Sequence, residues 1–210
     1  MDNLYFFVEK IYFGRQILLM KCSRLPVSLF FFVFNYASAQ LKLPINNSLR
    51  TDFQKIVTEY PLHFEGIRGS IVNQNPQTIE YSSELKPGDA VECSIIQYSS
   101  GRKPIYSWQG VMFISEDFEA ASKKYRWLFN QLKGLNIFYV KDQYTLQGSF
   151  EEADESRKFT NSVLEPVSPP EPLKKLKIEV ALRFEFPEWK VNLLVYEKER
   201  EDDERGETEE

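Results

Sequence analysis

An alternating run of residues near the end of the chain most constrains its fold. Between residues 176 and 186 every second side chain is apolar, and most of the side chains between them are charged. Successive side chains of a strand point to opposite faces, so this run predicts a strand with one buried and one solvated face. Pro187 and Glu188 are predicted to turn the chain, and residues 189–196 to return as a second strand. Such a pair is typical of an antiparallel sheet with one covered face.

Two other segments have the periodicity of amphipathic helices. The first is predicted over residues 47–59, where apolar side chains recur at helical spacing and Pro61 stops the helix. The second is predicted to begin at Ser115, a good N-cap, and it carries acidic residues in its first turn. Gly134 is predicted to end it. Each helix has one apolar face, so we expect both to pack on the sheet.

The remaining periodic segments predict short strands joined by turns. They cover residues 67–72, 78–82, 90–98, 105–114, 136–140, 144–150 and 158–164. Because short loops join successive strands, we predict an α+β fold with two helices packed on antiparallel β-meanders, in one sheet or two consecutive sheets. A helix followed by at least four strands occurs twice. A pseudo-duplicated α-β4 unit is therefore the finer hypothesis. It is supported by the Asp-Phe pair that opens each helix and by a Gly-Ser pair in each half, although the spacing between them is unequal.

Residues 20–39 have the three parts of a secretory signal peptide: a basic start, an apolar middle and an A-x-A pattern at the end. The apolar middle is about ten residues long, whereas a membrane span needs roughly 20. We therefore predict cleavage between Ala39 and Gln40, and a bacterial protein that is periplasmic or secreted. Residues 1–19 carry acidic side chains ahead of the basic start, and we interpret them as a non-native upstream extension. An uncleaved amphipathic anchor is the alternative.

The acidity of the chain is concentrated at its end. The whole sequence has 26 basic and 31 acidic residues, a net charge of −5. Residues 197–210 hold nine acidic and three basic residues, which predicts an acidic disordered tail after a single domain over residues 40–196. The domain itself is close to neutral. Nucleic acid is not expected as a partner, because phosphate binding needs a basic stripe.

The sequence contains no recognisable catalytic, cofactor-binding or metal-binding motif. Its one histidine, His63, cannot build the usual multi-histidine zinc site, and no serine lies in a G-x-S-x-G pattern. Of the two cysteines, Cys22 belongs to the predicted leader, so Cys93 is left without an internal disulfide partner. Cys93 alternates with Val91 and Ile95, which predicts a small buried side chain. No catalytic, cofactor-binding or metal-ligating residue is therefore assigned.

The predicted hairpin at residues 97–110 is the candidate interaction surface. It combines tyrosine, tryptophan and basic side chains, which are the residue types that most often anchor protein interfaces: Tyr98, Arg102, Lys103, Tyr106 and Trp108. The alternative is that Tyr106 and Trp108 pack under the helices.

These observations favour a non-enzymatic exported binding protein that recognises an unknown protein partner through a sheet face or hairpin. A periplasmic carrier of an apolar small molecule, in a pocket between helix and sheet, is the alternative. Enzymatic activity is the least favoured hypothesis, and no stable membrane span is expected after signal cleavage.

Overall fold

The computed structural model describes residues 47–88, 90–99 and 103–197. All of them belong to the second of two compact units of the chain, Lys42–Glu210. The predicted leader, the cleavage site and nearly all of the predicted acidic tail lie outside the described residues.

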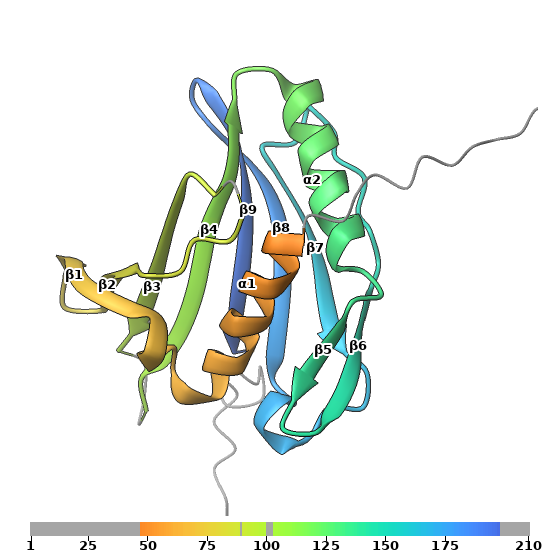
Figure 1. The fold of residues 1–210 in the computed structure, drawn as a ribbon. Coiled ribbons are helices and arrows are strands. Elements are labelled where there is room, and N and C mark those ends of the chain that lie inside the picture. The colour runs from red at the N-terminus through yellow and green to blue at the C-terminus, as the bar shows by residue number, and fades with distance from the viewer. Residues whose placement is uncertain (1–46, 89, 100–102, 198–210) are drawn as a thin grey trace, which may run out of the picture. The chain divides into compact units, whose positions relative to one another are not determined.

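The described residues form two α-helices, three short 3-10 helices and nine strands (Figure 1). The helices are α1 (Asn47–Glu59), η1 (Tyr60–Leu62), η2 (Glu65–Ile67), α2 (Phe118–Leu132) and η3 (Glu171–Leu173). The first four strands are β1 (Arg68–Gln74), β2 (Thr78–Ser83), β3 (Glu92–Tyr98) and β4 (Ile105–Ser115). The other five are β5 (Asn136–Tyr139), β6 (Asp142–Gly148), β7 (Phe159–Pro166), β8 (Leu176–Glu185) and β9 (Glu188–Glu197).

All nine strands belong to one antiparallel sheet with the order β1-β2-β3-β4-β9-β8-β7-β6-β5. The prediction of an α+β fold with helices on an antiparallel sheet is therefore confirmed, and the sheet is continuous. The pairing of β4 with β9 joins the strands that follow α1 to those that follow α2. It runs from Ser107 opposite Tyr196 to Ser115 opposite Trp189.

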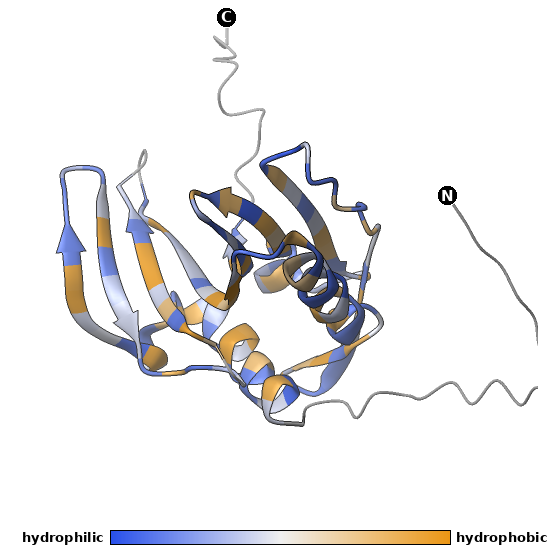
Figure 2. Ribbon diagram, turned by 90° about the horizontal axis from the view of Figure 1, so that it is seen from above, coloured by the Kyte–Doolittle hydropathy of each residue, from blue (hydrophilic) through white to orange (hydrophobic). Residues whose placement is uncertain are grey.

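Both α-helices lie on the same side of the sheet, as the view from above shows (Figure 2). Alternate residues of the central strands face the helices, which produces the buried-and-intermediate burial pattern of β8 and β9. The helices cover this face of the sheet, and their buried large side chains include Phe53, Ile56, Tyr125, Leu128 and Phe129. β1 and β2 extend beyond the helices, so most of β1 is exposed.

Two local predictions need correction. Phe186 was expected to continue the buried face of β8, but it is 90% exposed. It lies outside the strand, in the Phe186–Pro187 turn to β9, where the alternation ends. The N-cap of α2 is Asp117, not Ser115, because the Asp117 carboxylate accepts the Glu119 backbone N–H at 2.9 Å. Ser115 instead accepts the Asp117 backbone N–H at 3.0 Å.

Candidate binding site

The structure separates the predicted interaction residues into three groups. Tyr98 ends β3 with 39% of its surface exposed, and Lys103 is exposed just before β4. Arg102 lies outside the described residues. Tyr106 and Trp108 point to the helix-covered face of β4.

Trp108 does not belong to an exposed surface. Its side chain is fully buried, and its indole N–H donates to the Ser83 hydroxyl at 3.0 Å. The alternative interpretation, in which this residue packs beneath the helices, therefore describes its position. A partner on the surface cannot reach it.

Tyr106 lies at the edge of the core, within a set of stacked side chains. Its ring is 5.0 Å from the His63 ring, measured between centroids, and the planes are tilted by 31°. The Arg68 guanidinium lies 4.9 Å from the centre of the Tyr106 ring and 5.1 Å from that of Tyr81. Arg68 also donates to the His63 backbone carbonyl at 3.1 Å. Tyr106 is thus held in place by two neighbours, and the His63 ring forms the outer end of the set.

The backbone after α1 explains why His63 faces outward. Pro61 interrupts the helix, and the chain tightens into η1. His63 and Phe64 both adopt positive φ, 55° and 59°, which turns the chain sharply. Phe64 is fully buried by this turn, whereas the His63 side chain stays exposed.

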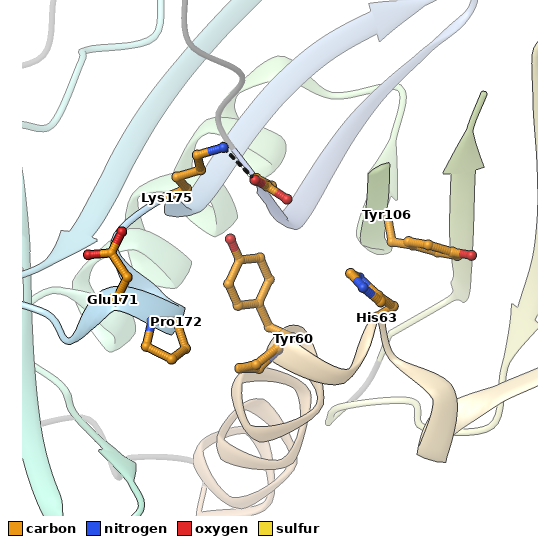
Figure 3. A pocket seen from close by; sticks show the side chains of 8 residues that line it. Tyr60, His63, Tyr106, Glu171, Pro172 and Lys175 are labelled. Carbon is orange, nitrogen blue, oxygen red and sulfur yellow. Dashed lines mark hydrogen bonds and ion pairs between the residues drawn. The ribbon is translucent and has the colours of Figure 1, made fainter. Parts of the chain in front are cut away.

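An open pocket of about 300 Å³ lies beside the His63 ring. We call it the seam pocket, because its walls come from segments that precede and follow α2 (Figure 3). It is lined by Tyr60, Pro61, His63, Tyr106, Glu171, Pro172, Lys175 and Glu197. This size is at the lower end for ligand sites, so the pocket suits a small group or one or two side chains of a partner.

Tyr60 is the most deeply placed polar residue of the seam pocket. Only 8% of its surface is exposed, and its hydroxyl points into the pocket toward the Lys175 side (Figure 3). The hydroxyl is not among the described buried polar atoms that lack a hydrogen-bond partner, so it is not an orphaned donor. Burial, with a smaller contribution from the Glu197 carboxylate, raises the pKa of Tyr60 well above its usual range. The phenol therefore stays protonated at neutral pH.

The charged residues of the pocket are arranged in opposite-charge pairs. Lys175 Nζ lies 2.9 Å from a Glu197 carboxylate oxygen, and Lys174 Nζ lies 3.2 Å from a Glu171 oxygen. All of these side chains reach solvent, so the pairs contribute little to stability. Lys174 does not line the pocket, so the lining itself carries two carboxylates, Glu171 and Glu197, and one ammonium, Lys175.

The seam pocket combines rings with hydrogen-bonding groups. Within the described ranges, no cluster of three histidine, cysteine or acidic side chains is arranged to hold a metal ion. His63 contacts an aromatic ring and not a nucleophile. The arrangement is suited to binding a neutral or mixed-charge group.

A second, more apolar hollow of about 520 Å³ lies between the end of α1 and β5. Its lining includes Leu62, Phe138 and Val140, whose side chains are 57%, 50% and 86% exposed. Like the predicted carrier pocket it lies between a helix and the sheet, but it is an open surface hollow.

Comparison of the chain with protein-family models, with curated proteins and with solved structures finds no match. In the part of the chain that the structure describes, no helix combines the length and the apolar character needed to cross a membrane.

Sequence reasoning identified Tyr106 but missed most of the seam pocket. The sequence patterns assigned no binding role to Tyr60 or His63. Glu171, Lys175 and Glu197 come from a proline-rich connector and from strand ends more than 100 residues away from Tyr60 in the sequence. No local pattern marks these residues, because only the sheet order brings them together.

Proposed function

We propose that the chain is an exported, non-enzymatic binding protein that contacts another protein through the β3–β4 hairpin and the adjoining seam pocket. The observation that carries this proposal is the open, ring-lined pocket, into which the protonated Tyr60 hydroxyl points where solvent or a partner can reach it. Tyr98 and Lys103 are exposed in the same hairpin, although Tyr98 pairs with Ile105 and therefore faces the other side of the sheet from Tyr106.

The order of strands supports a pseudo-duplicated architecture as the finer form of the fold. α1 precedes β1–β4, and α2 precedes β5–β9. The last strand of each series, β4 or β9, lies next to the other at the centre of the sheet. The second series has one strand more than the first, so the proposed repeat is an α-β4 unit with an addition.

The proposed site of action is the bacterial periplasm or the medium, and it rests on the signal-like residues 20–39. N-terminal sequencing and intact mass of protein from the exported fraction test it. A start at Gln40 supports export, whereas a start at Met1 contradicts it.

Photo-crosslinking in producing cells tests the proposed interaction surface. A photoreactive amino acid is placed at Tyr98 or Lys103, and at Lys141 as a control. Lys141 is also exposed but lies in the β5–β6 turn, at the opposite end of the sheet order. We expect one discrete protein adduct from the hairpin positions and none from the control. Equal labelling at all three positions, or no adduct at the hairpin, would overturn the proposal.

Carriage of an apolar small molecule is the second candidate, because the hollow beside β5 exposes apolar side chains. Native mass spectrometry of freshly purified protein tests it. A stoichiometric small-molecule adduct that is lost in a Phe138→Glu variant would support a carrier. A bare protein mass would contradict it.

A further inference from the structure

The two edge strands of the sheet, β1 and β5, differ in what covers them. At β5 the Gln54 side chain hydrogen-bonds both backbone groups of Phe138. Within the described ranges, β2 is the only strand that pairs with β1, and no helix or loop hydrogen-bonds to the backbone from Gly69 to Gln74. Backbone groups on the outer side of an edge strand are a template for another strand. The β1 edge is therefore open, whereas the β5 edge is not.

The residues of β1 do little to protect this open edge. Natural edge strands usually carry lysines or prolines that prevent pairing, but residues 69–74 (GSIVNQ) contain neither and have no charge. Ile71 and Val72 are 55% and 62% exposed. The pairing of β1 with β2 shifts register on each side of Ile71. Such irregularities increase the local twist and shorten the stretch that a new strand can follow. A reversible contact centred on Ile71 is the result expected.

Ile71 is also the uncovered end of a row of core residues that crosses the sheet. It lies opposite Tyr81, which lies opposite Ile95, and the row continues to Trp108. Ile95 and Trp108 are fully buried, and Tyr81 is partly buried against the core. The helices stop short of β1, which leaves Ile71 in solvent (Figure 1). A strand added beyond β1 would extend this row and cover Ile71.

The symmetry of β1 selects which strand fits. Ile71 is the middle residue of the seven in Arg68–Gln74. In an antiparallel pair of two copies, a two-fold axis through Ile71 places this residue against its own copy and Arg68 against Gln74. An apolar side chain then meets an apolar one at the centre, and no charged side chain faces another of the same sign. A second copy of the chain is thus complementary to this edge.

We infer that two copies of the chain associate through antiparallel pairing of their β1 strands about a two-fold axis at Ile71. The pairing joins the two sheets edge to edge. One pair of seven-residue strands buries less than the roughly 1,200 Å² of a standard protein interface, so the dimer is reversible and not obligate. This inference does not depend on the binding partner proposed above.

Cysteine trapping tests the register. Ile71→Cys and Gln74→Cys are made separately in full-length protein that carries Cys22→Ala, where buried Cys93 is the only other cysteine. Opposite residues of paired strands have Cβ atoms about 4.5–5.5 Å apart, so mild oxidation should give a disulfide-linked dimer of the Ile71→Cys variant. Residue 74 would lie roughly 20 Å from its own copy and should give none. Equal trapping of both variants, or of neither, would overturn the inference.

Sedimentation velocity across a wide range of protein concentrations tests the association itself. We expect the unmodified chain to form a dimer as its concentration rises. Ile71→Lys should abolish this dimer, because two like charges would then meet at the axis. Val140→Lys is the matched control: Val140 is 86% exposed but follows β5, at the other edge, and its substitution should leave the dimer unchanged.

Three outcomes of these experiments would overturn the inference. The first is a monomer at every concentration, and the second is equal loss of the dimer in Ile71→Lys and Val140→Lys. The third is a disulfide between the Ile71→Cys variant and a different protein in producing cells without any self-linked dimer. That result would show that the open edge of β1 takes a strand of another protein and not of a second copy.

Discussion

At the scale of single residues, Cys93 shows how close packing in the sheet sets chemical reactivity. It lies opposite Gly110 in the pairing of β3 with β4, beside the buried ring of Trp108. A Cβ atom on Gly110 would come within 2.7 Å of that ring and 3.2 Å of the Cys93 sulfur, so only glycine fits there. The prediction that Cys93 is buried is confirmed, with 6% of its surface exposed.

Burial raises the pKa of the Cys93 thiol to about 11, partly offset by the nearby Lys86 charge. In a Cys22→Ala variant, where Cys93 is the only cysteine, we expect the pH midpoint of iodoacetamide labelling to lie near 11 in the folded protein. After unfolding in urea it should lie at about 8.5. Mass spectrometry of samples quenched across the pH range measures both midpoints.

The same shift predicts a loss of stability in alkali. The folded state keeps the Cys93 proton at pH values where the unfolded chain loses it, so this contribution is complete below the unfolded pKa. It declines as the pH rises toward about 11. Coincident labelling midpoints in folded and unfolded protein would show that the thiol is accessible and the argument wrong.

At the scale of elements, α1 protects one edge of the sheet. The Gln54 side chain accepts the Phe138 backbone N–H at 2.8 Å and donates to the Phe138 carbonyl at 2.8 Å. Its amide thus takes the place of a neighbouring strand along β5. An edge strand with free backbone groups can pair with strands of other chains. The Gln54 side chain occupies the backbone N–H and carbonyl of Phe138, an apolar residue of this edge strand, and so blocks such pairing there.

We expect Gln54→Ala to lower the free energy of unfolding by about 1–2 kcal/mol, because two hydrogen bonds to the backbone are lost. Amide hydrogen exchange at Phe138 should also be faster in the Gln54→Ala variant. Lys55→Ala is the matched control, since its only described partner is a solvent-exposed contact with Asp52 on the same helix. If the two substitutions change the exchange rate at Phe138 equally, the Gln54 side chain does not hold β5 in place.

At the scale of the whole molecule, the pairing of β4 with β9 makes one folding unit of the two series of strands. β9 supplies Val191, Leu193 and Val195 to the core, and all three side chains are fully buried. Leu193 lies opposite Gly110 on one side and Val180 on the other. Strands on both sides therefore depend on the same central residues.

We expect one cooperative unfolding transition in urea, with equal exchange free energies for amides of β3 and β8. Leu193→Ala should lower the exchange free energies of the β3 and β8 amides by about 2–5 kcal/mol, because it opens a cavity in the core at the centre of the sheet. Exposed Val72→Ala, on β1, serves as the control and should change neither by more than about 0.5 kcal/mol. Early loss of β3 protection alone would show that the two series unfold separately.

Much of the secondary structure could be predicted because it depends on local periodicity. The alternation in β8 and β9 and the helical spacing in α2 each bury one face, and the strand ranges agree with the structure to within a few residues. The exceptions lie at element ends. Phe186 and the Ser115 cap were misplaced because a turn or cap depends on backbone geometry, which the apolar pattern does not encode.

The sequence by itself determined the fold class, the amphipathic faces and the burial of Cys93, since each follows from side-chain hydrophobicity repeated at the period of a strand or a helix. Only the tertiary structure decided that the strands form one sheet with β4 beside β9. It also decided that Trp108 is inaccessible and that Tyr60, His63 and Lys175 share a pocket. Those outcomes depend on contacts between segments far apart in the chain, which no local pattern records.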